Sequence, residues 1–134
     1  MIDPRVAASF KKQSMMASLG AELVAAGDGR CVIRAPHLAQ FNQQHGAGHA
    51  AVAFALGDSA AGYAALTMLP EGKEVMSVEV KINLMSPAFG DGFEAVGEVM
   101  RAGRRLTVVR AEVFALTGTA RKSIALLQGT MIGV

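Results

Sequence analysis

The chain has 134 residues, 51% of them hydrophobic, which suits a single domain with a sizeable core. Its net charge is only +2, and it has one Tyr and no Trp, so neither a nucleic-acid surface nor an aromatic stacking platform is indicated. Cys31 is the one cysteine, which fits a reducing compartment, and the first residues show no secretory pattern. We therefore expect one domain spanning residues 1–134, located in the cytoplasm.

The N-terminal part of the chain predicts a short helix and a hairpin. Asp3 can cap the helix, Pro4 suits its first position, and apolar residues recur at roughly helical spacing. Residues 19–26 and 31–35 then predict two strands, which a Gly-Asp-Gly turn joins. Residues 37–48 form a polar loop, whose glycines predict that it is not a helix.

The stretch from Phe41 to Leu66 is the part that the remainder of the chain is expected to surround. From about His49 it predicts a helix with almost no polar face, and a helix that is apolar all round is buried. Asp58 is the one charge in this helix, and burying an ionised carboxylate without partners is expensive. Asp58 is therefore either capped by local hydrogen bonds or kept for chemistry. The charge and the glycines also argue against a membrane span.

The C-terminal half changes to a period of two residues. Between Val75 and Leu84 apolar and polar residues alternate, which predicts a half-buried antiparallel strand. Turn signals then separate three more strands, at residues 93–101, 105–116 and 122–132. The sequence thus predicts an α+β fold in which one helix is embedded among about six strands, mostly in hairpin order. The buried face of the first of these strands would carry Met76, Val78, Val80, Ile82 and Leu84.

Three familiar motifs are incomplete. Residues 46–51 match a loose dinucleotide fingerprint, but hairpins follow where strand-helix-strand units are required. Residues 57–62 lack one glycine of a nucleophile elbow, so we interpret Ser59 as a helix serine bonded to its own backbone. His45 and His49 have zinc-ligand spacing, but glycines oppose a helix there and no further ligand pair is evident. No metal site is predicted.

The arrangement that chemistry favours instead is a polar loop that leads into the N-terminus of a helix, with a carboxylate farther along the same helix. Backbone N–H groups of Ala50 and Ala51, together with the helix dipole, can stabilise negative charge developing on an acyl oxygen. Asp58 is some two and a half turns away, roughly 13 Å within one helix. One chain cannot easily direct both groups at one carbonyl, whereas a site between two copies could.

The order of four segments resembles one known family. They are QQHGAGHAAVAFALGDSAAGYAAL, VMSVEVKINLMSPA, RAGRRLTVVRAEVFA and LLQGTM. Together they resemble the hotdog-fold thioesterases of the PaaI type (phenylacetic acid degradation family), over roughly residues 15–132. The resemblance implies a hotdog fold, a long central helix wrapped by a curved antiparallel sheet. It also implies a homodimer or homotetramer that hydrolyses acyl-CoA at its interfaces, without a metal or redox cofactor.

Site roles also follow from the resemblance. Asp58 falls on the catalytic carboxylate, which is a general base toward water or a nucleophile. Ala50, preceded by His49, falls on a glycine whose N–H polarises the thioester carbonyl, and alanine retains that N–H. For His49 a structural role, holding the start of the helix, is the preferred interpretation.

The remaining correspondences concern substrate contacts. Gln43 falls on an Asn or Gln that orients the thioester or water, with Asn42 as the neighbouring possibility, and Ser77 falls on a serine near the reacting centre. Ala51 is a second backbone donor. Phe54 and Tyr63 either line the acyl pocket or belong to the core. The candidates for binding CoA phosphates, which a solvated basic surface would explain equally well, are Lys73, Arg101, Arg104 and Arg105.

Two alternative functions stay open. A non-catalytic acyl-CoA binding protein would use the same cleft and show binding without turnover. A hotdog hydratase or dehydratase would need an Asp and His pair, and the sequence shows no such pair beside Asp58. The sequence also leaves open whether the acyl group is aryl or medium-chain.

Overall fold

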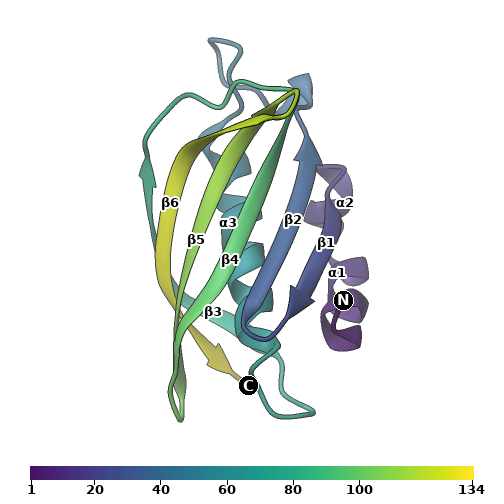
Figure 1. The fold of residues 1–134 in the computed structure, drawn as a ribbon, viewed down its shortest axis with the longest axis vertical. Coiled ribbons are helices and arrows are strands. Elements are labelled where there is room, and N and C mark those ends of the chain that lie inside the picture. Colours follow the sequence, from purple (N-terminus) through teal and green to yellow (C-terminus); the bar gives the residue numbers. More distant parts are fainter.

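The computed structural model describes residues 1–134. Six antiparallel strands curl around one long helix, and two short helices lie beside it (Figure 1). The predicted α+β architecture is confirmed. The helices are α1 (Pro4–Lys12), α2 (Ser14–Ser18), the 3-10 helix η1 (Ala39–Phe41) and α3 (Ala50–Leu66). The strands are β1 (Glu22–Gly27), β2 (Arg30–Pro36), β3 (Val75–Leu84), β4 (Gly92–Ala102), β5 (Leu106–Thr117) and β6 (Ala120–Gly133).

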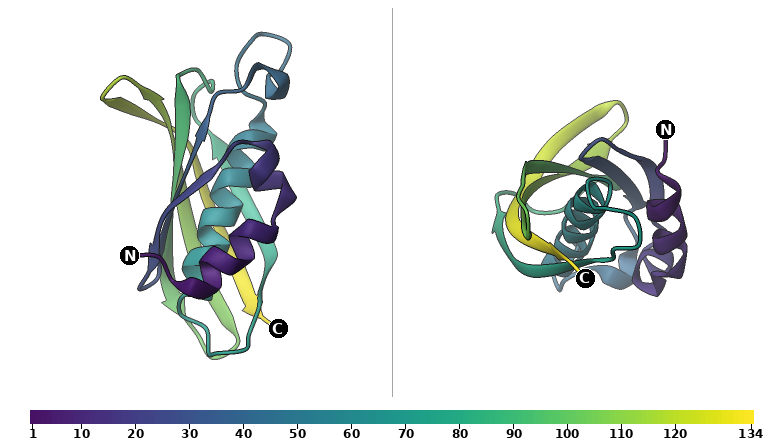
Figure 2. Two further views of the ribbon diagram at one scale, coloured as in Figure 1. Left: turned by 90° about the vertical axis from the view of Figure 1, so that its right-hand side faces the viewer. Right: turned by 90° about the horizontal axis from the view of Figure 1, so that it is seen from below.

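The central helix α3 lies unusually close to the sheet. A Cβ placed on Gly97 of β4 would collide with the backbone of Ala60 and Ala61, so helix and strand backbones nearly touch at this point. Ala60 and Ala64 are fully buried. Small residues on both elements therefore permit the contact, and the sheet curls around α3 (Figure 2, right). No helix in the structure combines the length and the hydropathy that crossing a membrane requires.

The strand order is β1-β2-β4-β5-β6-β3, so the strands are mostly in hairpin order, as predicted. The pairs β1–β2, β4–β5 and β5–β6 are antiparallel neighbours that follow one another in the chain. Strand β3 instead pairs with β6 and forms one edge of the sheet. The other edge, β1, is partly covered because Asp3 N–H donates to the Ala26 carbonyl and Ala26 N–H donates to the Met1 carbonyl.

The predicted buried face of β3 is wrong in its first half. The pairing of β3 with β6 shifts register between Ser77 and Glu79, and a bulge of this kind exchanges the two faces of a strand. Val80 and Ile82 pack against the core as predicted. Met76 and Val78, however, are more than half exposed, and so is Leu84 at the end of the strand. The alternation is therefore real but changes phase at the bulge.

The N-terminal boundaries also differ from the prediction. The first helix ends at Lys12 and a second one, α2, follows it, so residues 4–18 form two helices. Leu19 is not in a strand but is the buried C-terminal cap of α2, and Gly20 turns the chain with φ +66° before β1. The loop after β2 contains η1, although the sequence predicted no helix there.

Cys31 is fully buried on β2. Removal from water raises the pKa of its thiol to about 12. Because the thiolate is the reactive form of cysteine, this side chain is inert in the folded protein.

The contact between α3 and β4 predicts opposite effects for two glycine substitutions. Gly97→Ala should lower the free energy of unfolding by about 2 kcal/mol or more, because its Cβ has no room against the Ala60 backbone. Gly62→Ala should instead raise it by roughly 0.5 to 1 kcal/mol, because this helical Cβ meets only Met131, at 4.0 Å, and alanine favours the helix. Urea unfolding of both variants tests the prediction. Equal effects of the two substitutions would contradict it.

Candidate active site

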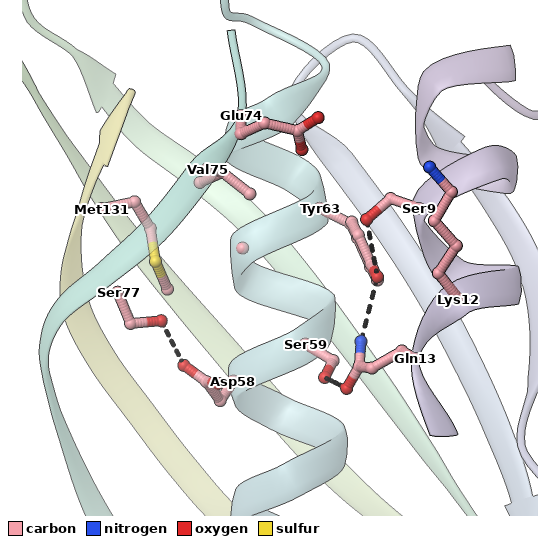
Figure 3. Close-up of a pocket in the computed structure, with 11 residues that line it drawn as sticks. Ser9, Lys12, Gln13, Asp58, Ser59, Tyr63, Glu74, Val75, Ser77 and Met131 are labelled. Carbon is pink, nitrogen blue, oxygen red and sulfur yellow. Dashed lines mark hydrogen bonds between the residues drawn. The ribbon is translucent and has the colours of Figure 1, made fainter. Parts of the chain in front are cut away.

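Asp58 is half-buried on α3, and the structure brings it to Ser77 on β3. The Ser77 hydroxyl donates a hydrogen bond of 2.7 Å to Asp58 Oδ1 (Figure 3). The other carboxylate oxygen, Oδ2, has no protein partner. The arrangement orients the carboxylate and leaves one oxygen available to a proton or to a carbon atom. Of the two expectations for Asp58, local hydrogen bonding or chemistry, the structure shows one local hydrogen bond, from Ser77, and leaves the second oxygen free for chemistry.

A cavity of about 370 Å³ lies beside this pair. Its walls come from α1, α3, β3 and β6, together with Glu74 just before β3 and Gln13 between α1 and α2 (Figure 3). Most of the lining residues are polar, although apolar atoms contribute as much of the lining surface as polar ones. The lining residues are Ser9, Lys12, Gln13, Asp58, Ser59, Gly62, Tyr63, Glu74, Val75, Ser77 and Met131.

One wall of this cavity is a connected set of hydrogen bonds that the sequence did not predict. Gln13, between α1 and α2, donates through Nε2 to the Tyr63 hydroxyl at 2.9 Å and accepts through Oε1 from Ser59 at 3.1 Å. The hydroxyl of Ser9 lies 3.2 Å from that of Tyr63. Ser59 therefore bonds to Gln13, and its interpretation as a serine bonded to its own backbone is wrong. The signal available in sequence was the four-residue spacing of Ser59 and Tyr63.

Gln43 and Ala50 lie in a different cavity, of about 350 Å³, at the N-terminal end of α3. The side-chain oxygen of Gln43 accepts from His45 N–H, so its amide nitrogen is the free end. The backbone N–H of Ala50 makes no hydrogen bond in the chain and is exposed. The remaining lining residues are Ala47, Gly48, Ala53, Leu84, Met85, Ser86, Pro87, Ala88 and Ile124.

His49 is the N-cap of α3. Its Nδ1 accepts a hydrogen bond of 2.9 Å from Ala51 N–H, and its carbonyl accepts from Val52 N–H. The structural role preferred for His49 is therefore confirmed. The expectation that Ala51 supplies a second free donor is wrong, because the cap already occupies its N–H. Ala50 is left as the backbone donor at this end of the helix.

Asn42 is held away from the Gln43 cavity. Its side-chain oxygen lies 2.6 Å from His37 Nε2, and His37 Nδ1 lies 3.0 Å from the Gly90 carbonyl. The imidazole also packs on the ring of Phe93, with centroids 5.3 Å apart. His37, which carried no signal in the sequence, thus fastens the loop before Gln43 to the turn before β4.

The other predicted residues are spread over the molecule. Tyr63 is buried and has its hydroxyl in the Asp58 cavity, so it is both core and lining. Phe54 is exposed on α3 and lines neither of the two cavities described above. Lys73 lines a small cavity with Lys12 near the end of α3. Arg101, Arg104 and Arg105 surround a further cavity of about 570 Å³ at the β4–β5 turn, at the opposite end of the sheet from the α3 N-terminus (Figure 1).

Within one chain the candidate residues therefore form two separate groups. Asp58 and Ser77 belong to one cavity, and Gln43 and Ala50 to the other. No group of three or more His, Cys, Asp and Glu side chains lies close enough to hold a metal ion. What the chain presents is an oriented carboxylate in one place and a free helix N-terminal donor in another.

Comparison with known proteins agrees with this architecture. A family model described as the thioesterase superfamily matches residues 45–121. The chain belongs to the thioesterase superfamily, and its fold is the hotdog fold of the PaaI type. A thioesterase family protein from Silicibacter pomeroyi has a similar solved structure, with 36% identity, a TM-score of 0.94, and coverage of 97% of this chain and 96% of that chain.

Other relatives are more distant. A conserved protein from Pseudomonas aeruginosa is 30% identical, with a TM-score of 0.82 and coverage of 91% of this chain and 94% of its own. The PaaI protein from the phenylacetic acid degradation operon of E. coli is 23% identical, with a TM-score of 0.85 and coverage of 96% and 89%, and shows the fold alone. A candidate esterase of Saccharolobus solfataricus is 29% identical over 104 residues, which are 77% of this chain and 74% of that protein.

The capping role of His49 predicts that substitutions of His49 and of His45 change the free energy of unfolding by different amounts. His49→Ala should lower the free energy of unfolding by about 1 kcal/mol, because Ala51 N–H loses its acceptor, while His49→Asn should restore most of it. His45→Ala is the matched control, since the exposed His45 ring makes no hydrogen bond. Denaturant unfolding of the three variants measures the effect. His49→Ala with the stability of His45→Ala would refute the capping role.

Proposed function

We propose that the protein hydrolyses acyl-CoA thioesters to a free acid and CoA, with an aryl or medium-chain acyl group. The observation that carries the proposal is the Asp58 carboxylate, oriented by Ser77 through one oxygen and free at the other, beside a cavity. Membership of the thioesterase superfamily supports the reaction class. Fold alone would not, because one fold serves many functions.

The chemistry assigns distinct tasks to the two groups of residues. In one route Asp58 takes a proton from water while the water oxygen attacks the thioester carbon; in the other the carboxylate attacks and water later releases the acyl group. Either way negative charge develops on the carbonyl oxygen. A helix N-terminal N–H such as that of Ala50 is suited to stabilise it. The C–S bond then breaks, and CoA leaves as a thiolate that takes up a proton.

A second copy of the chain is needed to complete this site. Ala50 and Asp58 are eight residues apart on α3, a rise of roughly 12 Å, which is too far for one carbonyl to contact both. The edge of β3 is unpaired, and its exposed side chains Met76 and Val78 are apolar. Phe54 and Ala51 are also exposed on α3. We infer a homodimer, or a homotetramer built from dimers, in which Asp58 of one copy faces Ala50 of the other.

The remaining polar residues fit substrate positioning. The free amide nitrogen of Gln43 can donate to the thioester oxygen or to water. Arg101, Arg104 and Arg105 give a cluster of guanidinium groups of the kind that binds phosphates, here those of CoA. No histidine lines the Asp58 cavity, which disfavours the hydratase alternative because that chemistry needs an Asp and His pair.

Asp58→Asn should abolish most thioesterase turnover, because the amide keeps the hydrogen-bonding shape but cannot take a proton or attack as a carboxylate. Gln43→Ala should lower kcat less severely. The assay is release of free CoA from phenylacetyl-CoA, benzoyl-CoA and saturated acyl-CoAs, with unfolding curves to verify that each variant is folded. Wild-type rates in Asp58→Asn would refute the catalytic assignment, and tight binding without turnover by the wild type would favour a binding protein.

Mixing two defective proteins tests whether the site is shared between copies. Asp58→Asn and Gln43→Ala chains, unfolded together and refolded at equal amounts, should show about a quarter of the wild-type rate, in addition to about a quarter of the Gln43→Ala rate that comes from the homodimers of that variant. Half of the dimers are then mixed, and one of their two sites combines an intact Asp58 with an intact Gln43. A rate of only about half that of Gln43→Ala alone, despite mixed dimers detected by differential tagging, would mean that each chain holds a complete site.

A further inference from the structure

Gln43 belongs to a short loop that is hydrogen-bonded mainly to itself. The backbone N–H of Gln43 donates to the Ala47 carbonyl at 2.8 Å, and its carbonyl accepts from Gly46 N–H at 3.2 Å. Its side-chain oxygen accepts from His45 N–H. Gly46 turns the chain with φ +86°. These bonds give the loop a defined shape, but they do not fix its position relative to the sheet.

Contacts on either side of the loop connect it to the rest of the domain. On the C-terminal side, Gly48 N–H donates to the Ala88 carbonyl at 2.9 Å. On the N-terminal side, Asn42 directly precedes Gln43, and its side-chain oxygen lies 2.6 Å from Nε2 of His37. The contact between Asn42 and His37 is therefore the side-chain anchor nearest to Gln43.

His37 is itself held from several directions, just after the end of β2. Its backbone N–H donates to the Asp91 carbonyl at 3.1 Å, and Nδ1 lies 3.0 Å from the Gly90 carbonyl oxygen. The imidazole packs on the ring of Phe93, which is fully buried on β4. The ring therefore has a fixed position on the sheet, and it passes that position on to Asn42.

The position of the Gln43 amide matters because a hydrogen bond has a narrow range of distances. A donor is effective at about 2.7–3.2 Å from its acceptor. A displacement of about 1 Å can lower the rate of an enzyme roughly a hundredfold. Release of the Asn42 side chain would free the backbone next to Gln43, and the amide would then spend less time within reach of the thioester or water.

We propose that His37 is a positioning residue, which holds the Gln43 amide in place through the side chain of Asn42. This inference rests on the proposed thioesterase function, in which Gln43 orients the thioester or water. His37 lines neither of the two cavities described above. It therefore acts through its neighbour and does not touch the substrate.

Two substitutions of His37 separate its two side-chain contacts. His37→Gln keeps an amide group at the position of Nε2, facing Asn42, whereas His37→Asn keeps one at the position of Nδ1, facing Gly90. Each variant loses one contact, so both should be destabilised to a similar extent in thermal unfolding. In an assay of CoA release, only His37→Asn should lower kcat, roughly tenfold and with KM nearly unchanged, because it loses the positioning of Gln43.

A double-mutant cycle tests whether the effect depends on Gln43. In a Gln43→Ala background, His37→Asn should cause no further loss of kcat, because the side chain that it misplaces is already absent. Asn42→Ala removes the same contact from the other side and should behave in the same way. Asp91→Ala is the matched control: it removes the hydrogen bond from Gly118 N–H at the same end of the sheet and should leave kcat unchanged in either background.

The outcomes separate this inference from the function on which it rests. Equal kcat values in His37→Gln and His37→Asn would overturn the inference, and so would losses that multiply when His37→Asn is combined with Gln43→Ala. A wild-type rate in Gln43→Ala would refute the role of Gln43, and the inference with it, while thioesterase activity stands. Absence of CoA release by the wild type from every acyl-CoA would refute the proposed function and the inference together. If His37→Asn fails to fold, Asn42→Ala takes its place in both comparisons.

Discussion

The close contact between α3 and β4 is the constraint on which the rest of the structure depends. Because Gly97 carries no side chain and Ala60 only a methyl group, the helix sits deep in the curved sheet. Its buried side is committed to packing, and only one stripe stays accessible. Ala50, Phe54 and Asp58 lie along that stripe, at successive turns of the helix. The packing that stabilises the domain thereby decides which residues can meet a substrate.

The same constraint explains why the candidate site is divided. A rigid helix keeps the donor at its N-terminus and the carboxylate in its middle at a fixed separation, and neither can move toward the other without unfolding the core. The unpaired edge of β3 lies beside Asp58 through Ser77. Sheet extension across that edge would bring a second α3 alongside. In the proposed dimer, this edge would therefore hold both the interface and the candidate site.

Much of this organisation could be predicted from the sequence, because it rests on local pattern. The apolar helix with Asp58 in its middle is visible as composition, the Gly-Asp-Gly hairpin as a turn motif, and the strands as an alternation of apolar and polar residues. The phase change in β3 was not, because a bulge adds one residue without leaving a compositional mark. Gln13 was missed for a different reason: its partners Ser59 and Tyr63 are more than forty residues away, and only the folded chain brings them together.

The buried sulfur of Cys31 has a consequence for a protein that handles activated acyl groups. Thioesters exchange readily with thiolates, so an accessible cysteine near the substrate would capture the acyl group and block the protein with its own reactant. Here the only sulfhydryl is enclosed in the core and stays protonated at neutral pH. The chain is therefore protected against self-acylation on sulfur, and water has no competing nucleophile of that kind.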